Sequence, residues 1–264
     1  MNSNNNDLAL LQIKIYTRKF FRTQKRESFI SIIIGILITL LVMYVTADKM
    51  FETYENTKSG MFAMICVCIW IGIFNSIQLV CREKNDIVKD ELDKSLRASS
   101  YMAAHFIYQF FLCIIQSIVV FAIFYLTLSD KLEGEPLEYL ITIFLVMYAS
   151  DAMAFVLSSA VPTPIVAMTL MPLLHLIQLV LAGVLFILEG GAANIADFTI
   201  SKWGMAAFGK IGDICSLPSF TEPDTELFVD HAASECWLYF ILFIIAFYFL
   251  SVFALKITTR KIKK

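Results

Sequence analysis

Charged residues are missing from long parts of this 264-residue chain. Segments 28–47, 59–81, 98–129 and 236–255 contain no Asp, Glu, Lys or Arg, and segment 139–188 contains only Asp151. The hydrocarbon core of a bilayer is roughly 30 Å thick and needs about 20 helical residues for one crossing. The absence of charge therefore excludes an ordinary soluble fold and predicts an integral membrane protein.

The sequence also lacks the short motifs of several enzyme classes. It has no GxxxxGK[ST] loop for nucleotide phosphates, no HExxH or CxxC pair for a metal, and no GxSxG turn for a serine nucleophile. Only three histidines occur, so a histidine-rich metal site is not expected. The chain is therefore predicted not to be an enzyme by itself and to bind no metal or cofactor of its own.

The uncharged segments predict an all-helical membrane domain over residues 28–255, between an N-terminal segment 1–27 and a basic tail 256–264. Six spans are expected at about 28–47, 59–81, 98–129, 139–160, 165–188 and 236–255. The block 139–188 is long enough for two crossings. It is interrupted at 161–164, where two prolines predict a tight hairpin between the fourth and fifth spans.

Lysine and arginine are distributed unevenly between the two ends of these spans. Six precede the first span, five lie between the second and third, and five follow the last. Cytoplasmic loops of membrane proteins carry an excess of these residues. Both termini are therefore expected in the cytoplasm of a plasma or inner membrane, with the longest outer loop at 190–235.

Three segments outside the spans have recognisable patterns. Residues 1–6 are polar and are expected to be disordered, whereas 7–26 predicts an amphipathic helix in the cytoplasmic interface or, alternatively, a basic flank that only fixes orientation. Segment 82–97, called the coupling segment below, places opposite charges three and four residues apart, which predicts an exposed helix or a solvated turn. In the outer loop, 195–198 and 203–211 predict short helices on or in the outer leaflet.

Five polar residues of the spans are candidates for lining a path across the membrane: Asn75, Gln78, Asp151, His175 and Gln178. A charge at membrane depth is costly, so Asp151 is expected to face other protein or a watery cavity. Hydrogen bonds between helices are the structural alternative for Asp151, His175 and Gln178. Asn75 and Gln78 lie near the inner end of the second span and either line an inner vestibule or sit at the interface.

Two cysteines fall on the predicted outer side of the membrane. Cys215 and Cys236 lie where a disulfide is chemically allowed, and two separate thiols are the alternative.

Two segments resemble the membrane-spanning permeases of ABC type-2 transporters. The first, 81–110, contains Arg82-Glu83, Glu91 and Ser99-Ser100-Tyr101, and is similar to the part of the family that leads from span two through a charged coupling helix into span three. The second, 178–214, is similar to span five, a glycine-containing turn and short outer helices. Its matching positions are Gly183, Phe186, Leu188, Gly190, Ser201, Trp203 and Ala207. The order of these features resembles the membrane domain of G-subfamily ABC exporters, which have the type V architecture.

This resemblance implies the permease subunit of an ATP-driven exporter. In this family two six-span units enclose the path, and a cytoplasmic ABC ATPase binds ATP and Mg²⁺. Because residues 1–27 leave no room for that ATPase ahead of the spans, a separate chain is expected to supply it. Coupling to the ATPase is implied for Arg82, Glu83, Asp86, Lys89, Asp90 and Glu91. Glu83 is expected to pair with a basic residue of the N-terminal helix, so that a force on one element reaches the other.

The expected partners are the ATPase subunit, a second permease in a homodimer or heterodimer, and membrane lipids, with no nucleic acid. Two other functions are considered. A membrane-embedded enzyme would use Asp151 and His175 in one water-accessible pocket. A non-transporting sensor or assembly subunit would need neither residue. The sequence does not identify a substrate.

Overall fold

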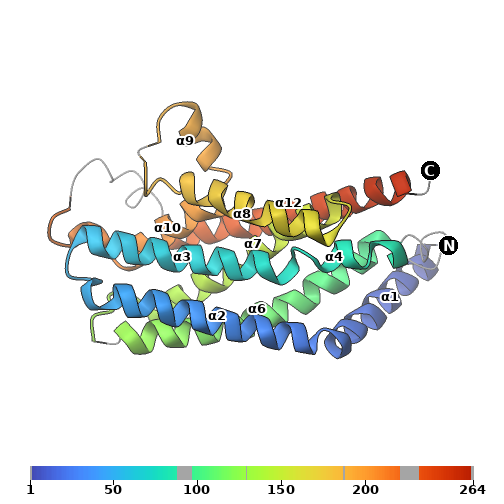
Figure 1. Cartoon of the computed structure of the whole chain (residues 1–264), viewed down its shortest axis with the longest axis horizontal. Helices are drawn as coiled ribbons and strands as arrows, with labels where there is room; N and C mark the ends of the chain where they lie inside the picture. Colours follow the sequence, from blue (N-terminus) through green and yellow to red (C-terminus); the bar gives the residue numbers. More distant parts are fainter. Residues whose placement is uncertain (1, 88–96, 129, 187, 221–231, 263–264) are drawn as a thin grey trace.

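A computed structural model describes residues 2–87, 97–128, 130–186, 188–220 and 232–262, with side chains from residue 7 to residue 260. The regular elements within these ranges are all helices (Figure 1). The long ones are α1 (Asn2–Thr23), α2 (Lys25–Thr46), α3 (Tyr54–Ser76), α6 (Ala98–Leu128), α7 (Pro136–Ala160), α8 (Pro164–Val180) and α12 (Ala233–Ile262). The short ones are η1 (Ala47–Lys49), α4 (Leu79–Arg82), α9 (Gly191–Ala196), α10 (Ile200–Ile211) and η2 (Ile214–Ser216).

Five stretches are long and apolar enough to cross a membrane in the part of the chain that the structure describes. They are α2 with η1, α3 continued through α4, α6, α7 and α12. The helix α8 is apolar but has only 17 residues. The chain is therefore a multi-pass membrane protein, and a sixth crossing by α8 remains a prediction.

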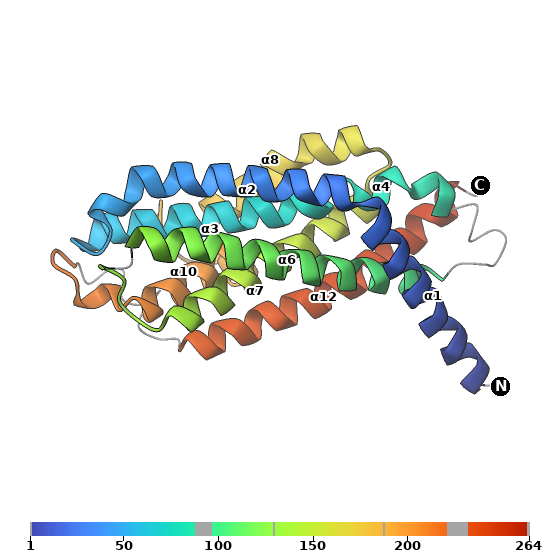
Figure 2. The same cartoon turned by 90° about the horizontal axis from the view of Figure 1, so that it is seen from below.

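The long helices run side by side, and the two chain ends lie at the same end of the bundle (Figures 1 and 2). The helix α1 leaves the bundle at an angle to α2 (Figure 2). Lysines and arginines gather at this end, and it is called the inner end below, after the orientation predicted from the sequence.

The helix α7 lies at the centre of the bundle and packs against α3, α6, α10 and α12. Gly72 of α3 allows a close approach between α3 and α7. A Cβ atom on residue 72 would lie 2.3 Å from the Met147 carbonyl oxygen and 2.8 Å from the Ser150 Cβ, both on α7. Only glycine fits there without moving one helix away from the other.

Three elements differ from what the sequence predicts. Residues 2–6, expected to be disordered, belong to α1, which no proline or glycine interrupts. The helix α8 ends at Val180 rather than near residue 188, because the chain turns at Gly183, whose φ of +75° favours glycine. The helix α10 is buried against α3, α7 and α12 rather than lying on the outer leaflet.

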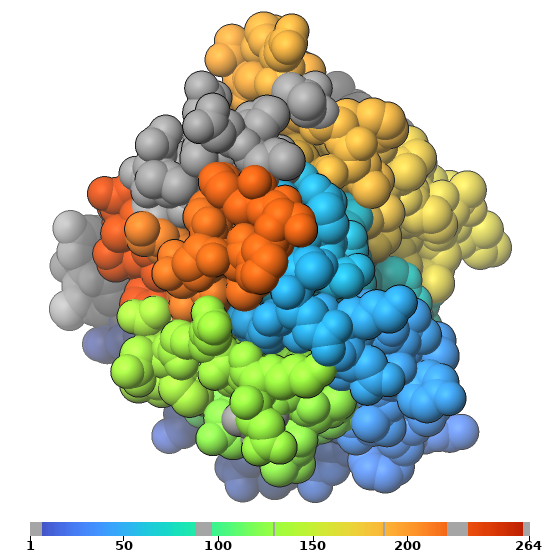
Figure 3. Space-filling model, turned by 90° about the vertical axis from the view of Figure 1, so that its left-hand side faces the viewer, coloured from blue at the N-terminus to red at the C-terminus, as the bar shows by residue number. Residues whose placement is uncertain are grey.

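The outer end of the bundle is closed by the segment around α10 and η2. Figure 3 shows this segment (orange) packed against the start of α3 (light blue). The Tyr54 amide donates to the Pro218 carbonyl oxygen at 3.0 Å, and the Phe208 side chain packs against Tyr139 and Phe124. The aromatic residues of α10 therefore extend the protein core at this end.

Candidate functional site

A pocket of about 320 Å³ lies where α2 and α4 meet at the inner end. This volume is at the lower end of the roughly 300–1,000 Å³ typical of ligand sites. Its lining comes from the start of α2, the end of α3, α4, α6 and α8. The residues are Gln24, Glu27, Ser28, Ile30, Ser31, Phe74, Asn75, Gln78, Leu79, Arg82, Gln109, Leu112 and Met168.

A closed ring of three side chains borders the inner wall of the pocket, and two of its members, Ser31 and Asn75, line that wall. The Ser31 hydroxyl donates to Asn75 Oδ1 at 2.5 Å, Asn75 Nδ2 donates to Gln116 Oε1 at 2.7 Å, and Gln116 Nε2 donates to Ser31 Oγ at 3.1 Å. The ring connects α2, α3 and α6, one residue from each helix. Because it satisfies polar groups that lipid cannot, it holds the three helices in register.

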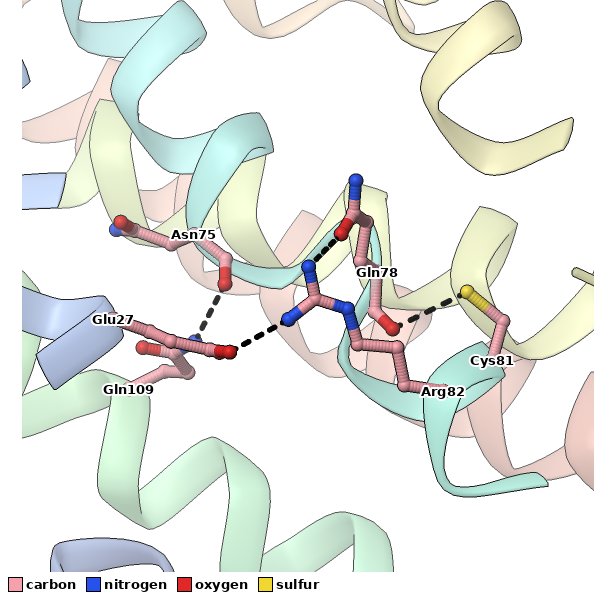
Figure 4. A network of polar contacts seen from close by, with 6 residues as sticks. All are labelled: Glu27, Asn75, Gln78, Cys81, Arg82 and Gln109. Carbon is pink, nitrogen blue, oxygen red and sulfur yellow. Dashed lines mark hydrogen bonds and ion pairs between the residues drawn. The ribbon is translucent and has the colours of Figure 1, made fainter. Parts of the chain in front are cut away.

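Gln109 of α6 contributes a second polar contact to this wall (Figure 4). Its Nε2 donates to the Asn75 carbonyl oxygen at 3.3 Å. This bond fixes the orientation of the amide, because a carbonyl oxygen only accepts. The Gln109 Oε1 atom is then buried without a donor among the described residues.

An ion pair lies at the mouth of the pocket. Arg82 Nη1 of α4 and Glu27 Oε1 of α2 are 2.7 Å apart, and Arg82 also donates to Gln78 (Figure 4). The two ionic side chains are 47% and 56% exposed. The pair therefore connects the start of α2 to the start of the coupling segment in a solvent-accessible place.

The structure describes three of the six predicted coupling residues. Arg82 pairs with Glu27, and Asp86 is exposed one turn further on. Glu83 accepts a hydrogen bond from the Tyr101 hydroxyl at 2.7 Å, at the start of α6. The expectation that Glu83 pairs with a basic residue of the N-terminal helix is therefore wrong in this structure. Lys89, Asp90 and Glu91 lie outside the described residues.

The helix α1 is attached to α6 by an aromatic cluster that sequence reasoning missed. The Phe20 ring stacks on the His105 ring with centroids 3.8 Å apart and meets the Tyr101 ring edge-on at 5.8 Å. Gln12 of α1 accepts from the Arg97 amide at 3.3 Å, just before α6. Tyr101 contacts both α1 and Glu83, so it connects α1 to the coupling segment. In the sequence, Phe20 stands out only as an aromatic residue at helical spacing within a basic segment, which does not predict its contact with α6.

Lys84 is a second residue that sequence reasoning missed. Its side chain is 2% exposed, and its Nζ donates to the carbonyl oxygens of Ser159 at 2.9 Å and Val161 at 2.6 Å. Burial lowers the pKa of this amine below its usual value of 10.5. The sequence does not indicate that Lys84 is buried, because it is one of several basic residues in a charged segment.

The pocket contains only two of the five polar residues predicted to line a path, Asn75 and Gln78. Gln178 of α8 has a structural contact instead. Its Oε1 accepts from the Ile200 amide at 2.9 Å and the Ser201 amide at 3.1 Å, which are the first amides of α10. These bonds connect α8 to α10 and satisfy amides that have no partner within the helix.

Asp151 and His175 do not line the pocket. Asp151 is fully buried where α7 meets α3, and its carboxylate has no hydrogen-bond partner among the described residues. The Ser76 hydroxyl donates to the Asp151 backbone carbonyl at 2.8 Å. His175 is half-buried on α8, and its Nδ1 also lacks a partner there.

Neither a disulfide nor a metal cluster is present among the described residues. Cys215 and Cys236 are both thiols, so the disulfide considered from the sequence is not formed in this structure. No group of three His, Cys, Asp or Glu residues that could hold a metal ion occurs in the described ranges.

The model of the ABC-2 type transporter family matches residues 11–196, which is more than half of the chain. The chain therefore belongs to this family, and it is the membrane-spanning permease component of an ABC transporter. The match begins within α1, extends through α9 and includes the whole pocket. No curated protein matches the chain.

Proposed function

We propose that this chain is the permease subunit of an ATP-driven exporter, with ATP and Mg²⁺ bound by a separately encoded cytoplasmic ATPase. The single observation that best supports this function is the pocket at the inner end. It is bordered by the Glu27–Arg82 ion pair at the point where α4 enters the coupling segment. Movement of the coupling segment would therefore change the pocket directly.

The pocket is the proposed inner part of the translocation path. One wall carries hydroxyls and amides from Ser31, Asn75 and Gln109, while Phe74 and Met168 are apolar. This arrangement suits an amphipathic molecule with a hydrogen-bonding head. A second permease, identical or different, would complete the path on the side of α2 and α8 that carries exposed apolar residues.

Coupling is proposed to use the described residues Arg82, Glu83 and Asp86 together with Lys89, Asp90 and Glu91 of the same segment. The Glu83–Tyr101 hydrogen bond supports this role, because Tyr101 also packs against Phe20 of α1. A force on the coupling segment would thus reach α1 and α6 together, without the ion pair expected from the sequence.

Purification of the protein in mild detergent tests the proposal. We expect an ATPase subunit to co-purify in stoichiometric amount, with vanadate-sensitive ATP hydrolysis. Replacing segment 82–97 by a flexible polar linker should abolish that hydrolysis or the association. Replacing the outer loop residues 130–135 in the same way is the matched control and should leave both intact.

The substitution Glu83→Gln tests the coupling role more finely. It removes the charge but keeps an acceptor for the Tyr101 hydroxyl, so the ATPase subunit should still co-purify. We expect a lower stimulation of ATP hydrolysis by transported substrate, measured against Glu52→Gln on the outer side. Unchanged stimulation would remove Glu83 from the coupling machinery.

A preparation without any nucleotide-binding partner would instead favour a sensor or assembly subunit. The membrane-enzyme alternative has less support, because it needs Asp151 and His175 in one pocket. The pocket at the inner end is lined by neither residue.

A further inference from the structure

Lys84 joins the start of the coupling segment to the turn between α7 and α8. Its Nζ donates to the Ser159 carbonyl in the last turn of α7 and to the Val161 carbonyl just beyond it. The last carbonyls of a helix have no partner within the helix and form the negative end of its dipole. A lysine is therefore a well-suited partner, and Lys84 completes the C-terminus of α7.

Lys84 follows the bend at Glu83 that ends α4, so it belongs to the coupling segment rather than to α4. The Glu83 carbonyl accepts from the amides of Asp86 and Ile87, both at 3.0 Å, so a new helical turn begins at Lys84. The other bonds between this region and the end of α7 come from α4 itself. Ser158 Oγ accepts from the amides of Val80 at 3.2 Å and Cys81 at 3.3 Å. Lys84 thus contacts α7 from the coupling side of the bend.

The turn that Lys84 holds is short and stiff. Only residues 161–163 separate α7 from α8, and prolines at 162 and 164 fix the backbone φ angle on either side of Thr163. Thr163 Oγ1 accepts from the Val166 amide at 3.4 Å and caps α8. A displacement of the Val161 carbonyl is therefore passed to α8 rather than absorbed, and Met168 of α8 lines the pocket.

Burial separates Lys84 from the ion pair at the mouth of the pocket. Glu27 and Arg82 are about half exposed, and such surface pairs contribute little to stability because water and salt screen them. Lys84 is almost fully buried, so separation from its two carbonyls would leave a buried donor and the Val161 carbonyl unsatisfied, while the Ser159 carbonyl would keep its hydrogen bond from the Thr258 hydroxyl at 3.1 Å. The contact therefore resists separation when the segment moves.

We propose that Lys84 is the positioning residue through which the coupling segment moves the α7–α8 turn, and with it α8 and the wall of the pocket. This inference rests on the proposed function, because an ATPase must move the segment.

The test follows the position of α8 in the complex purified with its ATPase and placed in lipid nanodiscs. Thr169, an exposed residue of α8 beside Met168, is replaced by cysteine in a background in which Cys66 and Cys215 are serine. The reaction rate with a water-soluble maleimide is measured with and without MgATP and vanadate. We expect nucleotide to change this rate when Lys84 is present. Lys84→Met should lose that change while the complex keeps its ATPase subunit and its basal ATP hydrolysis.

Two further variants test whether Lys84 passes the movement of the coupling segment to α8 or only stabilises the contact between α4 and α7. Lys84→Arg should keep the response, because a guanidinium reaches both carbonyls. Ser158→Ala removes the acceptor for Val80 and Cys81 and loosens the same contact between α4 and α7, yet it should also keep the response. An unchanged response in Lys84→Met, or an equal loss in Ser158→Ala, overturns the proposal.

Failure of the variant to assemble and absence of an ATPase subunit are separate outcomes of the same experiment. If Lys84→Met does not assemble with its ATPase subunit, Lys84→Gln replaces it in the experiment. Lys84→Gln should then lose the nucleotide-dependent change in reaction rate, and an unchanged response in this variant overturns the proposal. If no ATPase subunit co-purifies with the protein that retains Lys84, the proposed function itself is contradicted and this inference falls with it.

Discussion

Replacement of Gly72 is predicted to lower the stability of the protein. A methyl group at this position meets backbone atoms of α7, which cannot rotate away. We expect Gly72→Ala to lower the free energy of unfolding by about 1–3 kcal/mol, in the range of overpacked cores. Thermal melting in detergent measures the change.

Gly35→Ala is the matched control for this substitution. A methyl group at residue 35 meets only side-chain atoms of Ile71, the nearest at 3.1 Å. Because that side chain can shift by a few tenths of an ångström and alanine favours helix, the melting temperature should stay the same or rise. A larger loss at Gly35 than at Gly72 would contradict the packing of α3 on α7.

The pKa of Lys84 predicts a pH dependence of stability. Burial lowers this pKa below 10.5, so between the two values the unfolded chain binds more protons than the folded one. Stability then rises with pH in that window. The melting temperature of the protein, measured relative to Lys84→Met, should increase as the pH is raised through the lowered pKa of Lys84 towards 10.5. A relative decrease would show that the ammonium form is favoured in the fold.

At the residue scale, the sequence indicated candidate polar residues better than it indicated which residues contact each other. It named Asn75 and Gln78 from polarity at one end of a span, and both line the pocket, while their place on a translocation path stays a prediction. It did not identify Gln109 as a contact of Asn75, nor Tyr101 as the partner of Glu83, because both contacts join residues far apart in the chain. Such pairings depend on how the helices pack, which hydrophobic periodicity does not determine.

At the scale of elements, the ring of Ser31, Asn75 and Gln116 should contribute measurably to the packing of α2, α3 and α6. Asn75→Ala removes the central member and its side-chain bonds to both partners. Interhelical hydrogen bonds in membrane proteins average about 0.6 kcal/mol each, so we expect a loss of roughly 1–2 kcal/mol. Denaturation in mixed detergent micelles measures this loss.

Thr169→Ala is the control, because the Thr169 hydroxyl bonds only to the Ile165 carbonyl of its own helix. It should change stability much less than Asn75→Ala. Equal effects of the two substitutions would mean that the ring does not hold the helices together.

The sequence predicted the existence of helices more accurately than their ends. Uncharged length identified α2, α3, α6, α7 and α12, since a bilayer imposes that length. The end of α8 and the burial of α10 were not predicted. Gly183 and Trp203 were recognised only as matches to a family, and their roles follow from a left-handed turn and from packing between helices.

At the scale of the whole molecule, the shared end of the two termini predicts a topology. The lysine and arginine distribution predicts that this end lies in the cytoplasm. In intact cells, epitope tags at both termini should be protected from added protease. A cysteine introduced at Glu133, between α6 and α7, should react with a membrane-impermeant maleimide. Reaction at a terminal cysteine but not at residue 133 would invert the orientation.

The shortness of α8 has a consequence for the lipid around it. At 1.5 Å per residue its 17 residues span about 26 Å, several ångströms less than a typical hydrocarbon core. Pro164 and the turn at Gly183 limit the length of the helix, so α8, as the predicted sixth crossing, would require the bilayer beside it to thin, at a cost of a fraction of a kcal/mol per ångström. The protein should therefore be more stable in phospholipids with shorter acyl chains. Membrane thickness itself would then act on a helix that, through the proposed contact of Lys84, connects the coupling segment to the pocket.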